Sequence, residues 1–270
     1  METIETTSWE EFLSCLRFVQ SDLARHRKDS GKHVSTLLYR GQSDVEWTLK
    51  TTLDRYTRSQ VSLEEYFRKA AAIKPRIETF TSMAWEYDFR AAKAWSEHLP
   101  LGELPGYEYL VFLRHHGFPS PLLDWTASPQ VAAFFAFRDT APEADKVSVY
   151  AYCEMLSSGA ITPSGQPAIT TYGPAIRSHL LQQSQYTMCT VFRGGKQYFA
   201  MHEDAVKTKR KGVEDQDRIW KFNIPSSERG KVLALMREFN LHPFSLFSST
   251  ESLAETLALE HFGPVDVEQV

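Results

Sequence analysis

The sequence has 270 residues, 42% of them hydrophobic and 24% charged, so it is long and apolar enough to fold around a core and is not a disordered chain. With 30 Lys and Arg against 34 Asp and Glu, the net charge of −4 argues against a protein whose whole surface binds nucleic acid, but does not exclude a local basic groove. Three distant cysteines and the lack of a long apolar run exclude a disulfide framework, a cysteine-based zinc site and a membrane-spanning helix, so we expect a soluble, cytoplasmic protein without a metal.

Helical patterns dominate the first half of the chain. Two S-x-x-E sequences, Ser8 to Glu11 and Ser62 to Glu65, are typical of capping boxes that begin helices. The first predicts a helix over residues 8–29, and the second predicts a helical segment that reaches about Leu99 and that Pro75 breaks or kinks. Further helices are expected from Pro105 to His116 and over Gln130–Phe137, the latter behind the N-cap Ser128.

Strand-like alternation is typical of the second half. After an early buried strand at Ser35–Arg40, we expect the loop Phe118–Thr126 and then four strands, at Val147–Cys153, Gln185–Phe192, Lys196–Met201 and Arg218–Ile224. Helices return at about Ser227–Phe239 and Ser252–His261. The pattern predicts an α+β fold in which a helix-rich N-terminal half packs on a mostly antiparallel sheet, as a single domain over residues 1–270.

The basic residues gather in one short run. Lys207, Lys209, Arg210 and Lys211 lie within five positions. They form either a solvated hairpin loop or a contact for a phosphate-rich partner such as nucleic acid. The chain lacks the GxGxxG, GxxxxGK[ST], GxSxG and HExxH motifs, so the common signatures of dinucleotide folds, P-loop enzymes, serine hydrolases and metalloproteases are absent.

Two segments of the chain resemble the FRG domain, a family named for a Phe/Tyr-Arg-Gly tripeptide. The tripeptide is Tyr39-Arg40-Gly41, at the end of the expected first strand. The stronger match is RHHGFPSPLLDWT over residues 114–126, where the family pattern is Gln-His-x-Gly-x-Pro-Thr-Arg-Leu-Leu-Asp-Trp-Thr. A weaker likeness at Gln182–Thr187 extends the resemblance over about residues 35–255, nearly the whole chain.

The chain departs from that pattern within the stronger block. Arg114 stands where the pattern has Gln, and Ser120 and Pro121 stand for Thr-Arg. If the arginine of the pattern contacts a ligand phosphate in relatives, that contact is lost here or is supplied elsewhere, for example by Arg114.

The order of these blocks is similar to that in ADP-ribosyltransferases, which implies an ADP-ribosyltransferase-like fold and NAD as substrate. On that resemblance, Arg40 grips an NAD phosphate with its forked donors, and Thr126 and Ser128 bind ribose hydroxyls. Asp124 and Gln182 stabilise the positive charge that develops as the bond to nicotinamide breaks. The implied catalytic residues are Arg40, His115, Asp124, Gln182 and Gln183, and the implied NAD-binding residues are Tyr39, Arg40, Gly41, Gln42, Trp125, Thr126 and Ser128.

The same resemblance implies a biological role. Enzymes of this class often act as bacterial toxins or as effectors of defence against phage, so the expected acceptor is a nucleic acid or a protein. An antitoxin or another inhibitory partner is expected as well.

Each candidate residue also has a purely structural interpretation. Arg40 and Asp124 can form a buried ion pair, His115 and Trp125 can pack in the core, and Gln182 and Gln183 can be surface residues before a strand. Two alternative functions stay open: a non-catalytic module that binds a nucleotide, and an RNA- or DNA-binding protein that uses the basic run over residues 207–211.

Overall fold

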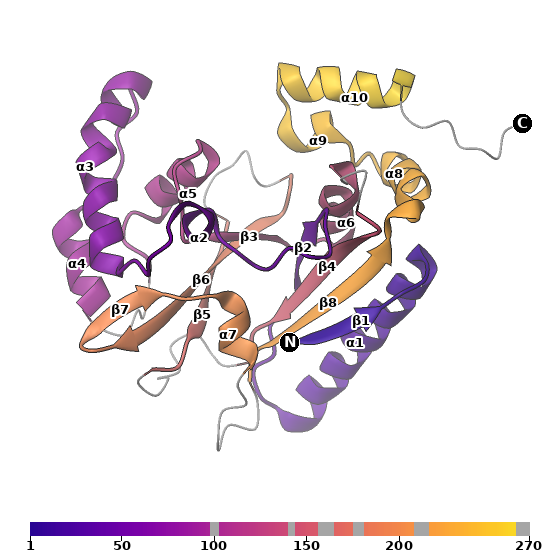
Figure 1. The fold of residues 1–270 in the computed structure, drawn as a ribbon, viewed down its shortest axis with the longest axis horizontal. Helices are drawn as coiled ribbons and strands as arrows, with labels where there is room; N and C mark the ends of the chain where they lie inside the picture. Colours follow the sequence, from indigo (N-terminus) through magenta and orange to yellow (C-terminus); the bar gives the residue numbers. More distant parts are fainter. Residues whose placement is uncertain (98–102, 140–143, 156–164, 175–180, 208–215, 263–270) are drawn as a thin grey trace, which may run out of the picture.

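The computed structural model describes residues 1–97, 103–139, 144–155, 165–174, 181–207 and 216–262. In this part of the chain, eight strands form one open sheet in the order β1-β8-β4-β2-β3-β6-β5, with β7 paired to β6 (Figure 1). Among the described strands, β1 and β8 run parallel and the other pairs are antiparallel. The strands are β1 (Glu2–Glu5), β2 (Leu38–Gln42), β3 (Leu123–Thr126), β4 (Lys146–Cys153), β5 (Ala168–Tyr172), β6 (Ser184–Arg193), β7 (Lys196–Phe199) and β8 (Arg218–Pro225).

Helices flank this sheet, and most of them come from the first half of the chain. They are α1 (Trp9–Ser30), α2 (Thr52–Tyr56), α3 (Leu63–Thr81), α4 (Phe89–Glu97), α5 (Tyr107–His115), α6 (Pro129–Arg138), α7 (His202–Lys207), α8 (Arg229–Glu238), α9 (Pro243–Phe247) and α10 (Thr250–Phe262). The expected α+β organisation, with a helix-rich first half and a mostly antiparallel sheet, is confirmed. Over the described ranges, no helix combines the length and the apolar character that crossing a membrane requires.

Both predicted serine caps are confirmed. The hydroxyl of Ser8 accepts a hydrogen bond from the amide of Glu11, and that of Ser62 accepts one from the amide of Glu65, each at 3.2 Å. The reciprocal half of the first capping box was wrong, because the carboxylate of Glu11 accepts from the amide and the hydroxyl of Thr7 and not from residue 8. At the start of α1, Ser8 therefore caps the amide of Glu11, and the carboxylate of Glu228 accepts from the amide of Trp9 at 2.9 Å.

The long helical pattern after Ser62 forms two helices, α3 and α4, and the break between them is not at Pro75 as expected. Pro75 lies inside α3 and does not end it, and the helix runs on to Thr81. It ends where Ser82 adopts a left-handed backbone with a φ of 55°. The remaining part of the pattern forms α4, so the break comes at a C-cap and not at the proline.

The expectation of a loop over Phe118–Thr126 was wrong for its last four residues. They form β3, which lies in the middle of the sheet between β2 and β6. The register places Thr126 opposite Tyr39 of β2 and Asp124 opposite Tyr186 of β6. The two family-like segments, 39–41 and 114–126, are thus brought together by strand pairing.

The core is divided between the two faces of the sheet. On β4, Val147 and Val149 pack with α1, α6 and α8, whereas Tyr150 and Tyr152 pack on the opposite face. A further apolar cluster joins α3, α4 and α5 to Tyr186 of β6. The group of α1, α6 and α8 and the group of α3, α4 and α5 lie on either side of β2 and β3 (Figure 1). Residues of both strands line a cleft.

Candidate active site in the cleft beside β2 and β3

A cleft of about 500 Å³ lies beside β2 and β3. Its walls come from α2 and the segment before it, and from α6 and α9 (Figure 1). Most of the predicted site residues line it: Tyr39, Arg40, Gly41, Gln42, His115, Asp124, Trp125, Thr126 and Gln182. Of the predicted catalytic and NAD-binding residues, Ser128 and Gln183 do not line it.

Arg40 is a fixed cation on the cleft floor, with 17% of its side chain exposed. Its Nη1 donates a hydrogen bond of 2.8 Å to the backbone carbonyl of Asp124. Its Nη2 has no hydrogen-bond partner within the described ranges and, unlike Nε, is not fully buried. The pKa of Arg40 is lowered to about 10, mainly by burial and also by the nearby charges of Arg114 and Arg55, while the charge of Asp124 acts in the opposite direction. Arg40 therefore stays charged at neutral pH and presents one free donor edge.

Asp124 is held mainly by Arg114. Arg114 Nη2 lies 2.5 Å from Oδ2 of Asp124, whereas Arg40 Nη1 lies 3.9 Å from the same oxygen. Arg114 belongs to the last turn of α5, so this contact ties that helix to β3. The expected ion pair of Arg40 with Asp124 is present only as the longer of two contacts, and Arg114 brings a second guanidinium close to the cleft.

We expect Asp124→Asn to lower the free energy of unfolding by about 2 kcal/mol, because Arg40 and Arg114 would then face each other without a counter-charge. This figure is below that for a fully buried pair, since 31% of the Asp124 side chain is exposed. Urea unfolding measures it. The matched control is Asp139→Asn, whose carboxylate is 72% exposed and which should change stability by less than about 0.5 kcal/mol. Equal losses in both variants would contradict the prediction.

Gly41 has a packing role that the resemblance did not suggest. A Cβ at this position would lie 1.9 Å from the carbonyl oxygen of Ala132 and 2.6 Å from the amide nitrogen of Ala136. The backbone of β2 thus lies directly against the backbone of α6. The glycine allows this contact with α6, which fixes the helix against the cleft floor.

The hydroxyls predicted to bind ribose are already engaged. Thr126 Oγ1 donates to the carbonyl of Gln182 at 2.7 Å and accepts from the amide of Ser128 at 3.1 Å. Ser128 caps the N-terminus of α6. Gln183 has a left-handed φ of 50°, and its carbonyl accepts from the amide of Ala127 at 3.1 Å. Thr126 and Ser128 therefore shape the turn that leads to Gln182.

Gln182 connects the cleft floor to α9. Its Nε2 donates to the carbonyl of Leu246 at 3.1 Å, and its Oε1 accepts from the hydroxyl of Ser184 at 3.4 Å. A neutral amide cannot act as a base. The carboxylates that line the cleft are those of Asp124, on β3, and of Asp139, just after α6.

Two predicted aromatic contacts belong to the core, and two others are accessible. Tyr39 and Trp125 are each 3% exposed, and the indole N–H of Trp125 donates to the hydroxyl of Thr187 at 2.7 Å. By contrast, Trp47 and Phe247, which also line the cleft, are 47% and 40% exposed. The accessible rings, on opposite walls, are the ones that a planar ligand can contact.

Beneath Trp125, the imidazole of His202 is completely buried and lies 2.8 Å from the hydroxyl of Thr187 through Nε2. Burial, together with a smaller effect of the charge of Arg40, lowers the pKa of His202 from its ordinary value of 6.5 to about 3. Between pH 6.5 and about 3 the unfolded chain therefore binds a proton that the folded chain does not, so stability falls as the pH is lowered.

We expect this single group to contribute up to about 1.4 kcal/mol of lost stability per pH unit in that window. In His202→Gln that contribution is absent, so the free energy of unfolding should decline less steeply from pH 6.5 to 4 than in the wild type. Urea titrations at several pH values compare the two slopes. Parallel slopes would show that His202 is protonated in the folded protein or does not titrate separately.

His115 and Gln42 line the cleft and are both bound to the protein. His115 Nε2 lies 2.8 Å from the hydroxyl of Tyr186. Gln42 is 3% exposed, and its Nε2 donates to the carbonyl of Thr48 at 3.1 Å. Its Oε1 is buried without a partner among the residues that the structure places. Both side chains support the cleft wall, and the amide oxygen leaves an acceptor unused.

Arg55 and Trp47 also line the cleft, although neither was predicted from the sequence as a site residue. Arg55 is exposed on α2, and its guanidinium carbon lies 5.7 Å from the ring centroid of Trp47. No ion pair with Arg55 occurs in the part of the chain that the structure describes. One feature of the sequence could have indicated the helix that carries Arg55: Thr51 and Asp54 form a capping box, and this capping box begins the short helix α2.

Lys207, the one residue of the basic run over 207–211 that the structure describes, does not line the cleft. Lys207 lies 3.2 Å from Glu203 and 3.6 Å from Asp204, so acidic neighbours share its charge. Lys209, Arg210 and Lys211 lie outside the described residues. The alternative of nucleic-acid binding through this run stays a prediction.

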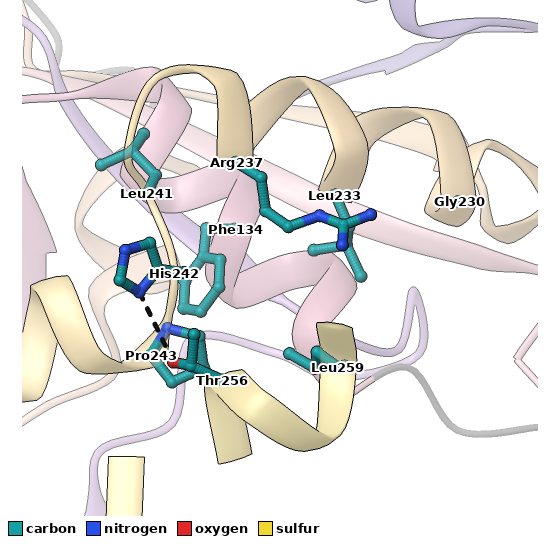
Figure 2. Close-up of a pocket in the computed structure, with 9 residues that line it drawn as sticks. All are labelled: Phe134, Gly230, Leu233, Arg237, Leu241, His242, Pro243, Thr256 and Leu259. Carbon is teal, nitrogen blue, oxygen red and sulfur yellow. Dashed lines mark hydrogen bonds between the residues drawn. The ribbon is translucent and has the colours of Figure 1, made fainter. Parts of the chain in front are cut away.

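A second, smaller cavity lies beneath α10 (Figure 2). It has a volume of about 40 Å³, with Phe134, Leu233 and Leu259 among its lining residues. Ligand pockets usually have volumes of roughly 300–1,000 Å³, so this space is a packing gap between helices. Within the described ranges, no group of three or more His, Cys, Asp or Glu residues is placed to hold a metal ion.

Comparison with known proteins adds one finding. Residues 35–145 match the family model of the FRG domain. Searches of curated proteins and of solved structures gave no match. The match includes β2, β3, α2, α5 and α6, whereas Gln182 and α9, which complete the cleft, lie beyond it.

Proposed function

We propose that this chain, which carries an FRG domain over residues 35–145, binds NAD in the cleft and transfers its ADP-ribosyl group to a macromolecule. One observation carries the proposal: two guanidinium groups with donors left unused face the same cleft, since the nearest carboxylate oxygen to Arg40 lies 3.9 Å away and Arg55 has no ion pair with a described residue. Arg40 is fixed through Nη1 and leaves Nη2 available, and Arg55 lies exposed beside the indole of Trp47. Forked cations suit the oxygens of a diphosphate, and an exposed indole suits a base.

The size of the cleft agrees with this ligand class. Its volume of about 500 Å³ lies in the ordinary range of ligand pockets. The half-exposed rings of Trp47 and Phe247 offer a contact on each wall for the two ring systems of a dinucleotide. A mononucleotide would use only one of these contacts.

In the proposed reaction, the bond between C1′ of the ribose and the nicotinamide nitrogen breaks, and its electron pair leaves with nicotinamide. A nucleophile of the acceptor then forms a bond to C1′ and loses its proton. The products are the ADP-ribosylated acceptor, nicotinamide and a proton. The carboxylate of Asp124, held in place by Arg114, would stabilise the positive charge that develops on the ribose.

From the sequence likeness to ADP-ribosyltransferases, the proposal also includes an ADP-ribosyltransferase-like fold for the sheet and a biological role of the same kind. The acceptor would be a protein or a nucleic acid. The enzyme would act as a bacterial toxin or as an anti-phage effector, with an inhibitory partner. Growth of cells that express the wild type should then be impaired, and the impairment should be absent with Arg40→Ala.

A second candidate function, a nucleotide-binding module without turnover, is favoured by one feature of the cleft. Asp124 is already engaged by Arg114, and Gln182 is neutral and bound to Leu246. Arg40 and Arg55 could bind the diphosphate without any catalytic contribution from Asp124 or Gln182. This alternative predicts NAD affinity without release of nicotinamide.

The test uses the full chain with NAD labelled in the adenylate phosphate and a cell extract as the source of acceptor. Transfer of label to protein or nucleic acid, with release of one nicotinamide per label transferred, would support the enzyme. Calorimetry with NAD alone separates the other cases. Binding without nicotinamide release would favour the module, and the absence of both would overturn the two proposals.

A further inference from the structure

The segment of residues 43–51, which is neither helix nor strand, joins β2 to α2 and forms part of the cleft wall (Figure 1). It carries Trp47, whose ring is 47% exposed and is one of the two base contacts in the proposed function. Among the described residues, one backbone hydrogen bond ties the segment to a strand, from the amide of Val45 to the carbonyl of Lys146 at 3.1 Å. The position of the ring therefore depends largely on side chains that hold the segment.

Four side chains form hydrogen bonds to the backbone of this segment. Three of them donate to carbonyl oxygens of residues 45–48, at 2.5 to 3.1 Å: Gln42 of β2, Tyr150 of β4 and Lys221 of β8. The fourth is Glu203 of α7, whose Oε1 accepts from the amide of Leu49 at 3.0 Å. Glu203 and Leu49 are 6% and 0% exposed, so this last hydrogen bond is shielded from water.

Glu203 and Tyr150 hold the backbone on either side of the Trp47 ring. The hydroxyl of Tyr150 donates to the carbonyl of Trp47 itself at 3.0 Å, and Glu203 holds the amide two residues further on. A carboxylate binds a backbone N–H more strongly than a neutral oxygen does. Burial, and to a smaller extent the charge of Glu203, raises the pKa of Tyr150, so its hydroxyl stays protonated and remains a donor. The two contacts therefore support each other.

Helix α2, which carries Arg55, is held by a different contact. The amide of Leu53 donates to the carbonyl of Ser120 at 3.0 Å, and Ser120 is completely buried. Neither residue belongs to the segment that Glu203 holds. A change at Glu203 should therefore displace Trp47 and leave the cation of Arg55 in place.

We propose that Glu203, together with Tyr150, positions the ring of Trp47 so that one base of NAD can stack on it. The inference rests on the proposed function, which gives the ring its ligand. Glu203 does not line the cleft, so it is a positioning residue that acts through the backbone of Leu49. Its loss should weaken the binding of a base and spare the binding of a diphosphate by Arg40 and Arg55.

Glu203→Met tests this separation, because methionine fills a similar volume and provides no oxygen to accept from Leu49. The variant should bind NAD about tenfold more weakly than the wild type, the size of effect expected from losing one stacked base. Its affinity for inorganic pyrophosphate, which has no base, should stay within about twofold of the wild type. Arg40→Ala should instead weaken both ligands. Calorimetric titration of the full chain measures these affinities, and the thermal midpoint shows that each variant is folded.

Two further variants separate the hydrogen bond from the charge. Asp204→Ala is the matched control, because Asp204 is the next residue of α7 and its carboxylate lies 3.6 Å from Lys207, whose amine is also 3.2 Å from Glu203. Among the described residues, Asp204 makes no hydrogen bond to residues 43–51, so NAD affinity should be unchanged. Glu203→Gln keeps an oxygen for Leu49 and should recover most of the affinity that Glu203→Met loses.

The position of the ring can also be measured without NAD. Trp47 is one of six tryptophans, so its fluorescence is the difference between each protein and the same protein with Trp47→Phe. Quenching of this difference by acrylamide should increase in Glu203→Met, by up to about twofold because the ring is already 47% exposed in the wild type. Tyr150→Phe should change both the quenching and the NAD affinity in the same direction, which keeps the inference testable if Glu203→Met does not fold.

Wild-type quenching and NAD affinity in folded Glu203→Met, or in Tyr150→Phe, would overturn the inference and leave the proposed function standing. Equal losses of NAD and pyrophosphate binding in Glu203→Met would overturn it too, because Glu203 would then support the whole cleft. The same holds if Glu203→Gln loses as much affinity as Glu203→Met. A folded wild type that binds neither ligand would overturn the proposed function, and the inference with it.

Discussion

Replacing Gly41 by alanine should destabilise the protein by more than about 3 kcal/mol, enough to prevent folding in a marginally stable domain. The new methyl group would meet the carbonyl oxygen of Ala132 at 1.9 Å and the amide nitrogen of Ala136 at 2.6 Å. Both atoms belong to the backbone of α6, so no side chain can turn away to relieve the clash. Either β2 or α6 would have to move, and with it the cleft floor. Urea unfolding and the yield of soluble protein measure the effect.

The matched control for this substitution is Gly173→Ala. A Cβ at Gly173 meets nothing within 4 Å, and its backbone φ lies outside the left-handed region. The same chemical change should therefore alter the free energy of unfolding by less than about 1 kcal/mol. A folded Gly41→Ala protein with the stability of this control would show that β2 and α6 are not packed as closely as described.

Replacing Arg40 by alanine should weaken NAD binding by about 100-fold, which is the effect of losing a charged hydrogen bond of roughly 1.5–3 kcal/mol. Arg40→Lys keeps the positive charge but lacks the planar fork, so its loss should be about tenfold. Because Arg40 also donates to the carbonyl of Asp124, a moderate loss of stability is expected in both variants. Calorimetric titration with NAD measures affinity, and the thermal midpoint shows which variants remain folded.

Arg25→Ala provides the control for the Arg40 series. Arg25 is exposed on α1, away from the cleft-lining residues, and its removal should leave NAD affinity unchanged. Equal affinities of wild type and folded Arg40→Ala would remove Arg40 from the binding site. The cleft would then need another cation for the diphosphate, and Arg55→Ala would become the next variant to measure.

The elements with strong periodic patterns were predictable because local signals and tertiary packing agree in them. The capping serine and the apolar stripe of Leu16, Val19 and Leu23 specify α1, and the run beginning at Val131 specifies α6. Short elements were not predictable in this way. Strand β3 has four residues and follows a proline-rich stretch, and α2 and α9 have five residues each, too few for a period to show.

The candidate site was predictable only where family-like segments supplied it. Arg40, Asp124 and Gln182 meet in one cleft because β2 pairs with β3 and β3 pairs with β6. Strand pairing also explains why the hydroxyl of Thr126 and the amide of Ala127 are engaged by the carbonyls of Gln182 and Gln183. Arg55 and Trp47 could not be found from spacing, because no sequence pattern shows that the segment before α2 folds over the end of β2.

The order of the strands also has a consequence for synthesis. At one edge of the sheet, Glu2 of β1 is paired with Trp220 of β8, and β8 is also the neighbour of β4. On the ribosome, β1 and β4 emerge long before β8, so one flank of β4 and the part of the apolar side of α1 that faces β8 stay uncovered until translation has passed Pro225. A nascent chain that ends before that point exposes apolar surface that β8 covers in the folded protein, and such surface favours aggregation until the distant strands pair.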